Sequence, residues 1–181
     1  MQVQLVVLYG PPGVGKYTIG VELAARTGFR LLHNHLTVNL VSAVFERDSV
    51  VWLQMLRKVR RDMLAEAVHH NVNLIMTGVF NGSSENINAW RTMLEPVEAE
   101  GGSVLFVQLT CEREELFRRV GQEDRRRLDK LVDAVRMAEL LERFDLFSPV
   151  PFGRHLCLDI THRAPSDAAR VIMQHYGIGS T

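Results

Sequence analysis

The stretch GPPGVGKYT, residues 10–18, follows directly on the apolar run 3–8 and is rich in glycine. It nearly matches G-x-x-x-x-G-K-[ST], the pattern of a strand-to-helix turn whose backbone N–H groups surround phosphate oxygens. Glycine permits the backbone angles and the close approach that a side chain would obstruct, and the helix N-terminus adds partial positive charge. The pattern therefore predicts a phosphate-binding loop. The residues expected to form it are Gly10, Gly13, Val14, Gly15 and Lys16.

The residue after the lysine departs from this pattern. A Ser or Thr hydroxyl usually stands there as a ligand for Mg²⁺, whereas this chain has Tyr17. A phenol on a rigid ring cannot occupy the position of that small hydroxyl. Either the metal loses a protein ligand, or Thr18, the nearest hydroxyl, supplies it. Lys16 is expected to place a mobile positive charge on the β- and γ-phosphates.

The order of apolar runs predicts an α/β fold with a parallel sheet, because short runs alternate with longer segments of helical period. The runs are continuous, as expected for strands that are buried on both faces. We expect one domain over residues 1–181. Strands are predicted at residues 3–8, 29–32, 72–80, 104–109 and 156–160, and helices at 17–27, 36–46, 49–69, 84–100, 112–121, 128–144 and 165–176.

Composition limits the partners and the location. The 21 basic and 21 acidic residues cancel, so no bulk charge attracts the chain to nucleic acid or to an anionic membrane. The two cysteines, Cys111 and Cys157, follow no metal-ligand spacing. No apolar run reaches the ~20 residues that a membrane-spanning helix needs, and the first residues lack the basic segment of a signal peptide. We expect a cytoplasmic protein with neither a membrane nor nucleic acid as its partner.

The loop GPPGVGKYT resembles that of adenylate kinases and related nucleoside-monophosphate kinases, in which G-x-P-G-x-G-K is followed by Gly and then Thr. Tyr17 takes the Gly position and Thr18 takes the Thr position. The strand order, a basic segment after the fourth strand and the short strand at 158–159 resemble, less specifically, the adenylate-kinase-like and shikimate-kinase-like group. This resemblance implies a three-layer α/β/α P-loop NTPase fold with five parallel strands. It also implies a small helical lid, here about residues 118–130.

The resemblance further implies a reaction and its cofactors. Such kinases bind ATP and Mg²⁺ and move the γ-phosphoryl group of ATP onto a small acceptor. Magnesium is held there largely by phosphate oxygens and water, as suits an ion that dehydrates reluctantly. Thr18 is accordingly expected near the metal or the α-phosphate, and the loop is expected to be competent despite Tyr17.

The acceptor side departs from the group that the loop resembles. Those kinases commonly carry an acidic residue after strand two or at the end of strand three, but residues 74–80 (LIMTGVF) contain no carboxylate. Strand two is followed by His33-Asn34-His35. Either imidazole could act as a base or hydrogen-bond the acceptor. Alternatively, Asn34 caps the following helix and both histidines are polar loop residues.

Two basic clusters are candidate anion sites. In segment 113–130, the resemblance implies that Arg119 and Arg126 close over the nucleotide and neutralise charge at the transferring phosphoryl group. The alternative is a solvated charged face, because acidic residues are interleaved. On the predicted helix 49–69, the second cluster is Arg57, Arg60 and Arg61. Arg57 and Arg61 share a face, which suits an acceptor bearing phosphate or carboxylate, or else forms a basic stripe in water.

These features favour an ATP-dependent phosphotransferase whose partners are a nucleotide and a small hydroxyl or phosphate acceptor. Two other functions stay open. The missing carboxylate and Tyr17 favour a switch or sensor that binds ATP without transfer. The basic clusters allow a kinase of a nucleic-acid 5′-hydroxyl, although zero net charge gives it little support. The candidate catalytic residues are Lys16, His33, His35, Arg119 and Arg126.

Overall fold

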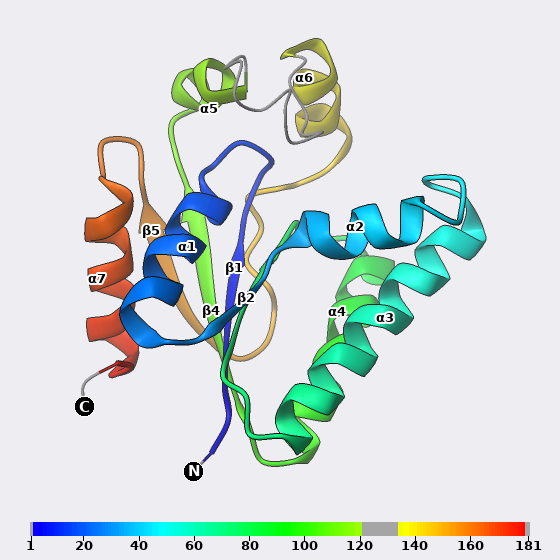
Figure 1. The fold of residues 1–181 in the computed structure, drawn as a ribbon. Helices are drawn as coiled ribbons and strands as arrows, with labels where there is room; N and C mark the ends of the chain where they lie inside the picture. The colour runs from blue at the N-terminus through cyan, green and yellow to red at the C-terminus, as the bar shows by residue number, and fades with distance from the viewer. Residues whose placement is uncertain (1, 121–133, 180–181) are drawn as a thin grey trace.

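The computed structural model describes residues 2–120 and 134–179. A five-stranded parallel sheet in the order β2-β3-β1-β4-β5 forms its centre (Figure 1). The strands are β1 (Gln4–Tyr9), β2 (Arg30–Leu32), β3 (Leu74–Gly78), β4 (Ser103–Thr110) and β5 (Arg154–Asp159). The helices are α1 (Lys16–Thr27), α2 (Asn34–Ser42), α3 (Val50–His69), α4 (Ser84–Ala99), α5 (Arg113–Val120), α6 (Ala134–Arg143) and α7 (Pro165–Tyr176).

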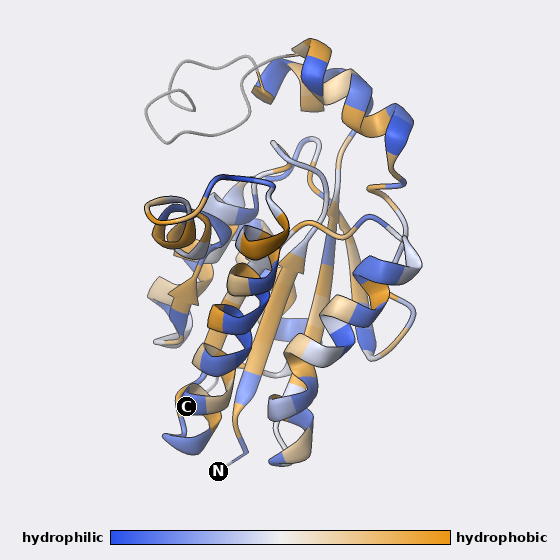
Figure 2. Cartoon of the chain, turned by 90° about the vertical axis from the view of Figure 1, so that its right-hand side faces the viewer, coloured by the Kyte–Doolittle hydropathy of each residue, from blue (hydrophilic) through white to orange (hydrophobic). Residues whose placement is uncertain are grey.

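The side chains of β1 alternate between two hydrophobic cores. Val6 and Leu8 pack in one core with residues of α1 and α7, whereas Leu5, Val7 and Tyr9 pack in the other with residues of α3 and α4. Figure 2 shows the strands as predominantly hydrophobic between these two helical layers. The arrangement confirms the predicted three-layer α/β/α fold with five parallel strands.

The chain after β2 differs from the prediction. The helix predicted from residue 36 begins earlier, at Asn34, and His33 occupies its N-cap position. The alternative interpretation, in which Asn34 caps the helix, is therefore wrong. Its backbone N–H instead donates to Oγ1 of Thr77 at 2.9 Å, and this bond links the start of α2 to the end of β3.

An aromatic ring lies close to the end of β3. β3 ends at Gly78, and a Cβ on that residue would lie 2.8 Å from Cζ2 of Trp90. The Trp90 ring is buried against Tyr9 and Phe80, with ring centroids 5.9 and 5.6 Å away. A side chain at position 78 would therefore require the Trp90 ring to shift.

The predicted lid falls largely outside the described residues, which omit 121–130 of the expected segment 118–130. It therefore stays a prediction. The helices that flank this segment in sequence, α5 and α6, lie beyond the carboxyl ends of the strands (Figure 1). Within residues 2–120 and 134–179, no helix is both long and apolar enough to cross a membrane.

The close packing of β1 against β4 generates a stability prediction for Gly10. This residue has φ 142°, and a Cβ there would lie 2.3 Å from the carbonyl oxygen of Leu109. We expect Gly10→Ala to lower the free energy of unfolding by about 3 kcal/mol or more, since backbone strain and a clash with backbone combine. Gly28→Ala is the matched control, because Gly28 has φ 74° and open space around it.

Chemical denaturation of both variants measures the difference. Gly28→Ala should cost about 1 kcal/mol, the strain of a left-handed residue alone. Equal losses for the two variants would show that the approach to Leu109 does not constrain the loop.

Candidate functional site

The glycine-rich loop between β1 and α1 forms a compact turn. Gly10, Gly13 and Gly15 all have positive φ, at 142°, 92° and 109°. The backbone N–H of Val14 donates to the carbonyl of Pro11 at 3.3 Å, and its side chain is buried. Gly15 is the N-cap of α1, so the N–H groups of the first helical turn have no acceptor within the helix. They give this end of α1 its partial positive charge.

Lys16 is the first residue of α1 and lies against this turn. Its Nζ donates to the carbonyl oxygens of Gly10 and Pro11, each at 2.7 Å. The ammonium is therefore held at the loop itself, on a flexible side chain that can exchange carbonyl oxygens for phosphate oxygens.

A cavity of about 380 Å³ opens beside the loop, a volume within the usual range for small-ligand sites. Its walls come from the loop and α1, from the β2–α2 junction, from the end of β3 and from α6. It lies at the carboxyl edge of the sheet, where open α/β sheets bind ligands. The lining residues are Pro12, Gly13, Gly15, Lys16, Tyr17, Thr18, His33, Asn34, His35, Arg47, Thr77, Val79, Arg136 and Leu140.

Most of the sequence-predicted residues meet at this cavity. Gly10 and Val14 are not in its lining and form the buried back of the loop. Arg126 lies outside the described residues. The predicted residues that do line the cavity are Gly13, Gly15, Lys16, Tyr17, Thr18, His33 and His35.

Tyr17 and the two histidines form one wall. The rings of Tyr17 and His33 pack edge to face, with centroids 4.9 Å apart and an interplanar angle of 83°. The strand ends before His33, yet the extended His33 and the helical His35 both reach the cavity. The Nδ1 atoms of both imidazoles are buried. Tyr17 thus helps to shape the cavity.

Thr18 is the hydroxyl that best fits a magnesium ligand. Its side chain is exposed, lines the cavity and follows Lys16 by two residues. Among residues 2–120 and 134–179, no cluster of three or more His, Cys, Asp or Glu side chains could hold a metal ion. A single hydroxyl suits Mg²⁺ when phosphate oxygens and water complete its coordination.

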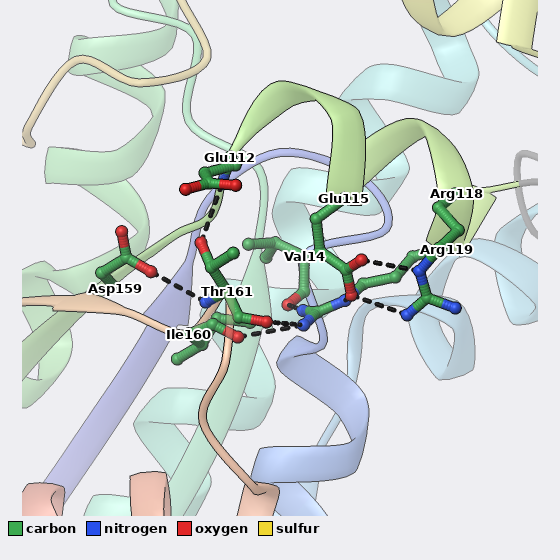
Figure 3. A network of polar contacts seen from close by, with 8 residues as sticks. All are labelled: Val14, Glu112, Glu115, Arg118, Arg119, Asp159, Ile160 and Thr161. Carbon is green, nitrogen blue, oxygen red and sulfur yellow. Dashed lines mark hydrogen bonds and ion pairs between the residues drawn. The ribbon is translucent and has the colours of Figure 1, made fainter.

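Arg119 links three parts of the site through its guanidinium (Figure 3). Nη1 donates to the carbonyl of Val14 at 3.1 Å, and Nη2 donates to the carbonyls of Ile160 and Thr161 at 2.9 and 3.1 Å. Nε donates to Glu115 at 2.6 Å. These bonds connect the loop, α5 and the β5–α7 connection. Contact between Arg119 and a transferring phosphoryl group stays a prediction.

The Glu115 carboxylate orients this arginine and has a strongly shifted pKa. It accepts hydrogen bonds from Nε of Arg118 and from Nε of Arg119, both at 2.6 Å. Hydrogen bonding to these two arginines, Arg118 first, lowers the pKa of Glu115 to about 2. The carboxylate therefore remains charged, and it holds the Arg119 side chain in place over the loop.

Sequence reasoning missed three polar residues of the cavity. Arg47 comes from the α2–α3 connection, Arg136 from α6 and Thr77 from β3. None belongs to a local motif, because each reaches the loop only through tertiary packing. The apolar pattern predicted that Thr77 lies in a strand. It did not predict that Thr77 lies where the end of β3 meets the start of α2.

Five parallel strands with a glycine-rich loop between the central strand and the first helix define a P-loop NTPase with the fold of a small kinase. The sequence matches the AAA domain family over residues 6–142, well over half of its length. The chain belongs to the AAA domain family. No curated protein sequence matches it.

Solved structures share this fold at low sequence identity. A sugar kinase from Janibacter sp. HTCC2649 aligns with a TM-score of 0.69 and 16% identity, over 98% of this chain and 96% of that one. Shikimate kinase from Acinetobacter baumannii aligns at 0.61 and 19%, over 96% and 93%. The APS kinase CysC from Mycobacterium tuberculosis aligns at 0.63 and 13%, over 97% and 98%. These likenesses confirm the kinase-like P-loop fold.

The contacts of Arg119 predict that its geometry, and not only its charge, stabilises the loop. Arg119→Lys keeps the charge but cannot reach Val14, Ile160 and Glu115 together. We expect the free energy of unfolding to fall by about 1–3 kcal/mol and the affinity for an ATP analogue to decrease, by calorimetry. Arg118→Lys is the control, because Arg118 shares Glu115 but is 64% exposed, against 19% for Arg119. Equal effects of the two substitutions would contradict this role.

The lowered pKa of Glu115 predicts how stability depends on pH. Folding lowers this pKa from 4.5 to about 2, so the charged carboxylate stabilises the fold above pH 4.5. That contribution is lost as the pH falls toward 2. Denaturation of the wild type and Glu115→Gln across this range should show a difference that is largest at neutral pH and shrinks on acidification. A difference independent of pH would rule out the charged pairing.

Proposed function

We propose that this protein is an ATP-dependent phosphotransferase that moves the γ-phosphoryl group of ATP to a hydroxyl or phosphate of a small acceptor. One observation carries the proposal. The phosphate loop with Lys16, the pair His33 and His35, and Arg136 line a single cavity at the carboxyl edge of a kinase-like sheet. A cytoplasmic location, where ATP is supplied, fits this reaction.

The triphosphate would bind along the loop and the first turn of α1. Backbone N–H groups at the helix N-terminus would receive its oxygens, and Lys16 would move from the carbonyls of Gly10 and Pro11 to the β- and γ-phosphates. Arg119 would act indirectly, by holding the carbonyl of Val14 and hence the loop in position. Because this transfer depends mainly on alignment, a fixed loop contributes directly to its rate.

Thr18 would hold Mg²⁺ together with phosphate oxygens and water. A metal held there would supply positive charge that neutralises the phosphate oxygens. Lys16 and Thr18 both lie in the first turn of α1 and both line the cavity, so both could contact a triphosphate bound there.

The acceptor would enter from the side of the cavity that His33, His35 and Tyr17 line. An imidazole there can orient the attacking hydroxyl and accept its proton at neutral pH. A carboxylate base is not required, since the attacking group needs little activation in a loose transition state.

Cationic side chains opposite the loop would neutralise the transferring phosphoryl group. Arg136 lines the cavity from α6, and we assign it this role on that position. Arg126 and the predicted lid segment, 118–130, belong to the same proposal through their place in the sequence next to α5 and α6.

Replacement of Lys16 tests the proposal. Lys16→Ala should abolish acceptor-stimulated release of ADP, a loss of at least about 100-fold, because the ammonium of Lys16 lies at the loop that would bind the phosphates. The fold should persist by circular dichroism. Lys58→Ala is the matched control, since Lys58 is an exposed lysine paired with Asp62 on α3, and it should keep wild-type turnover.

Three results would contradict the proposal. Wild-type turnover by Lys16→Ala would show that the loop takes no part in the reaction. Tight ATP binding with no consumption across a broad acceptor panel would identify a switch or sensor. Phosphorylation of an oligonucleotide 5′-end, with binding that weakens steeply as salt is added, would identify a nucleic-acid kinase.

A further inference from the structure

Arg57 and Arg61 on α3 do not form an anion site between them. Arg57 donates to Glu85 at 2.6 Å, and Arg61 donates to Glu95 at 3.4 Å, so each pairs with a carboxylate of α4. Both arginines are exposed. The helix face that they share is thus a solvent-exposed surface whose arginines pair with α4. This agrees with the alternative interpretation of the sequence, a basic stripe in water.

Arg60, between them in sequence, has a different environment. It is largely buried, its Nε donates to Oγ1 of Thr37 at 2.9 Å, and its Nη2 donates to Oδ1 of Asn34 at 2.6 Å. Both acceptors are neutral. Burial lowers the pKa of Arg60 to about 10, so the guanidinium remains charged at neutral pH.

No described residue supplies a counterion to Arg60. Across residues 2–120 and 134–179, no carboxylate pairs with it, and its Nη1 donates no hydrogen bond to a described residue. A buried charge without a partner is costly. An anion that bound there would remove much of that cost.

Arg60 lines a second cavity, which shares lining residues with the first. The second cavity has a volume of about 90 Å³, and Thr77 and Val79 line both this cavity and the first one, beside the glycine-rich loop. Asn86 adds a polar side chain, and its NH₂ group is a donor because its carboxamide oxygen accepts the N–H of Asn81. Trp90, Met76 and Met93 form an apolar wall. The space suits one compact polar group of a larger molecule.

We propose that this second cavity binds the anionic group, a carboxylate or a phosphate, of a small hydroxylated acceptor, and that Arg60 is its counterion. This inference rests on the proposed phosphotransferase function, which it deepens by naming the acceptor class. A guanidinium fork matches both carboxylate and phosphate oxygens. Thr77 and Val79 would then place the acceptor hydroxyl in the first cavity, near His33 and Lys16.

The missing carboxylate on β3 fits this acceptor class. An acidic side chain at the end of β3 would pair with Arg60 and cancel the charge that recognises the acceptor. Gly78 and the Trp90 indole above it keep that position apolar. A cationic acceptor would be repelled, and a neutral one would leave the buried guanidinium unpaired.

Binding of small probes tests the site without relying on turnover. Trp90 lines the second cavity, so its fluorescence in a Trp52→Phe background reports on occupancy. The phosphate loop is first saturated with a non-hydrolysable ATP analogue and Mg²⁺. Glycolate, inorganic phosphate and uncharged ethylene glycol are then titrated. We expect at least one of the two anions, but not ethylene glycol, to change the emission, and whichever anion does so identifies the acceptor group.

Substitutions identify the residue. Arg60→Gln should weaken anion binding by about tenfold or more, whereas Arg61→Gln, the neighbouring control, should change it by less than about twofold. Arg60→Lys retains a single point charge and should lie between the wild type and Arg60→Gln. Arg60→Lys also tests the role of Arg60 in anion binding if Arg60→Gln fails to fold. All folded variants should bind the ATP analogue as the wild type does.

Turnover then separates the two proposals. ADP release should be stimulated by hydroxy acids or by phosphorylated sugars, and not by the uncharged parent polyols. Equal use of charged and uncharged acceptors, or anion binding unchanged in Arg60→Gln, would overturn the anion site. Anion binding that depends on Arg60, together with ADP release that no acceptor stimulates, would support the anion site and contradict the proposed phosphotransferase function.

Discussion

The burial of β1 on both faces is the constraint on which the site depends. Its side chains alternate between two cores, and its backbone pairs with β3 on one side and β4 on the other. The strand therefore cannot shift its register without moving every apolar residue into the wrong layer. Because β1 is fixed, the turn that follows Tyr9 has one position, directly against the carbonyl of Leu109. The packing of β1 therefore determines the geometry of the phosphate loop.

A second polar network positions the opposite wall of the cavity. Thr77 at the end of β3 accepts the N–H of Asn34, and Asn34 in turn accepts a hydrogen bond from Arg60. This chain of bonds connects β3, α2 and α3. It sets the orientation of the first turn of α2, which contains His35, and it includes Arg60, which lines the second cavity. The glycine-rich loop and the α2 wall of the cavity are thus held by separate networks, and both involve β3.

The sequence predicted those parts of the site that local patterns encode. The loop is a local signal, since a strand, three glycines, a lysine and a helix follow one another in GPPGVGKYT, and the parallel sheet follows from the continuous apolar runs. The environments of the arginines on α3 could not be predicted in this way. Periodicity showed that Arg57 and Arg61 share a face, but their partners, Glu85 and Glu95, lie on another helix. The sequence grouped Arg60 with Arg57 and Arg61, and it did not show that Arg60 alone becomes buried, because that burial arises only when α2 packs on α3.

A crystal structure with a non-hydrolysable ATP analogue, Mg²⁺ and an anionic acceptor tests the central claim most directly. The account predicts that the triphosphate lies on the N–H groups at the start of α1, with Nζ of Lys16 on its β- and γ-oxygens, and that the acceptor's anionic group lies within hydrogen-bond distance of Arg60. A triphosphate bound away from the loop, or an acceptor anion bound far from Arg60, would contradict it.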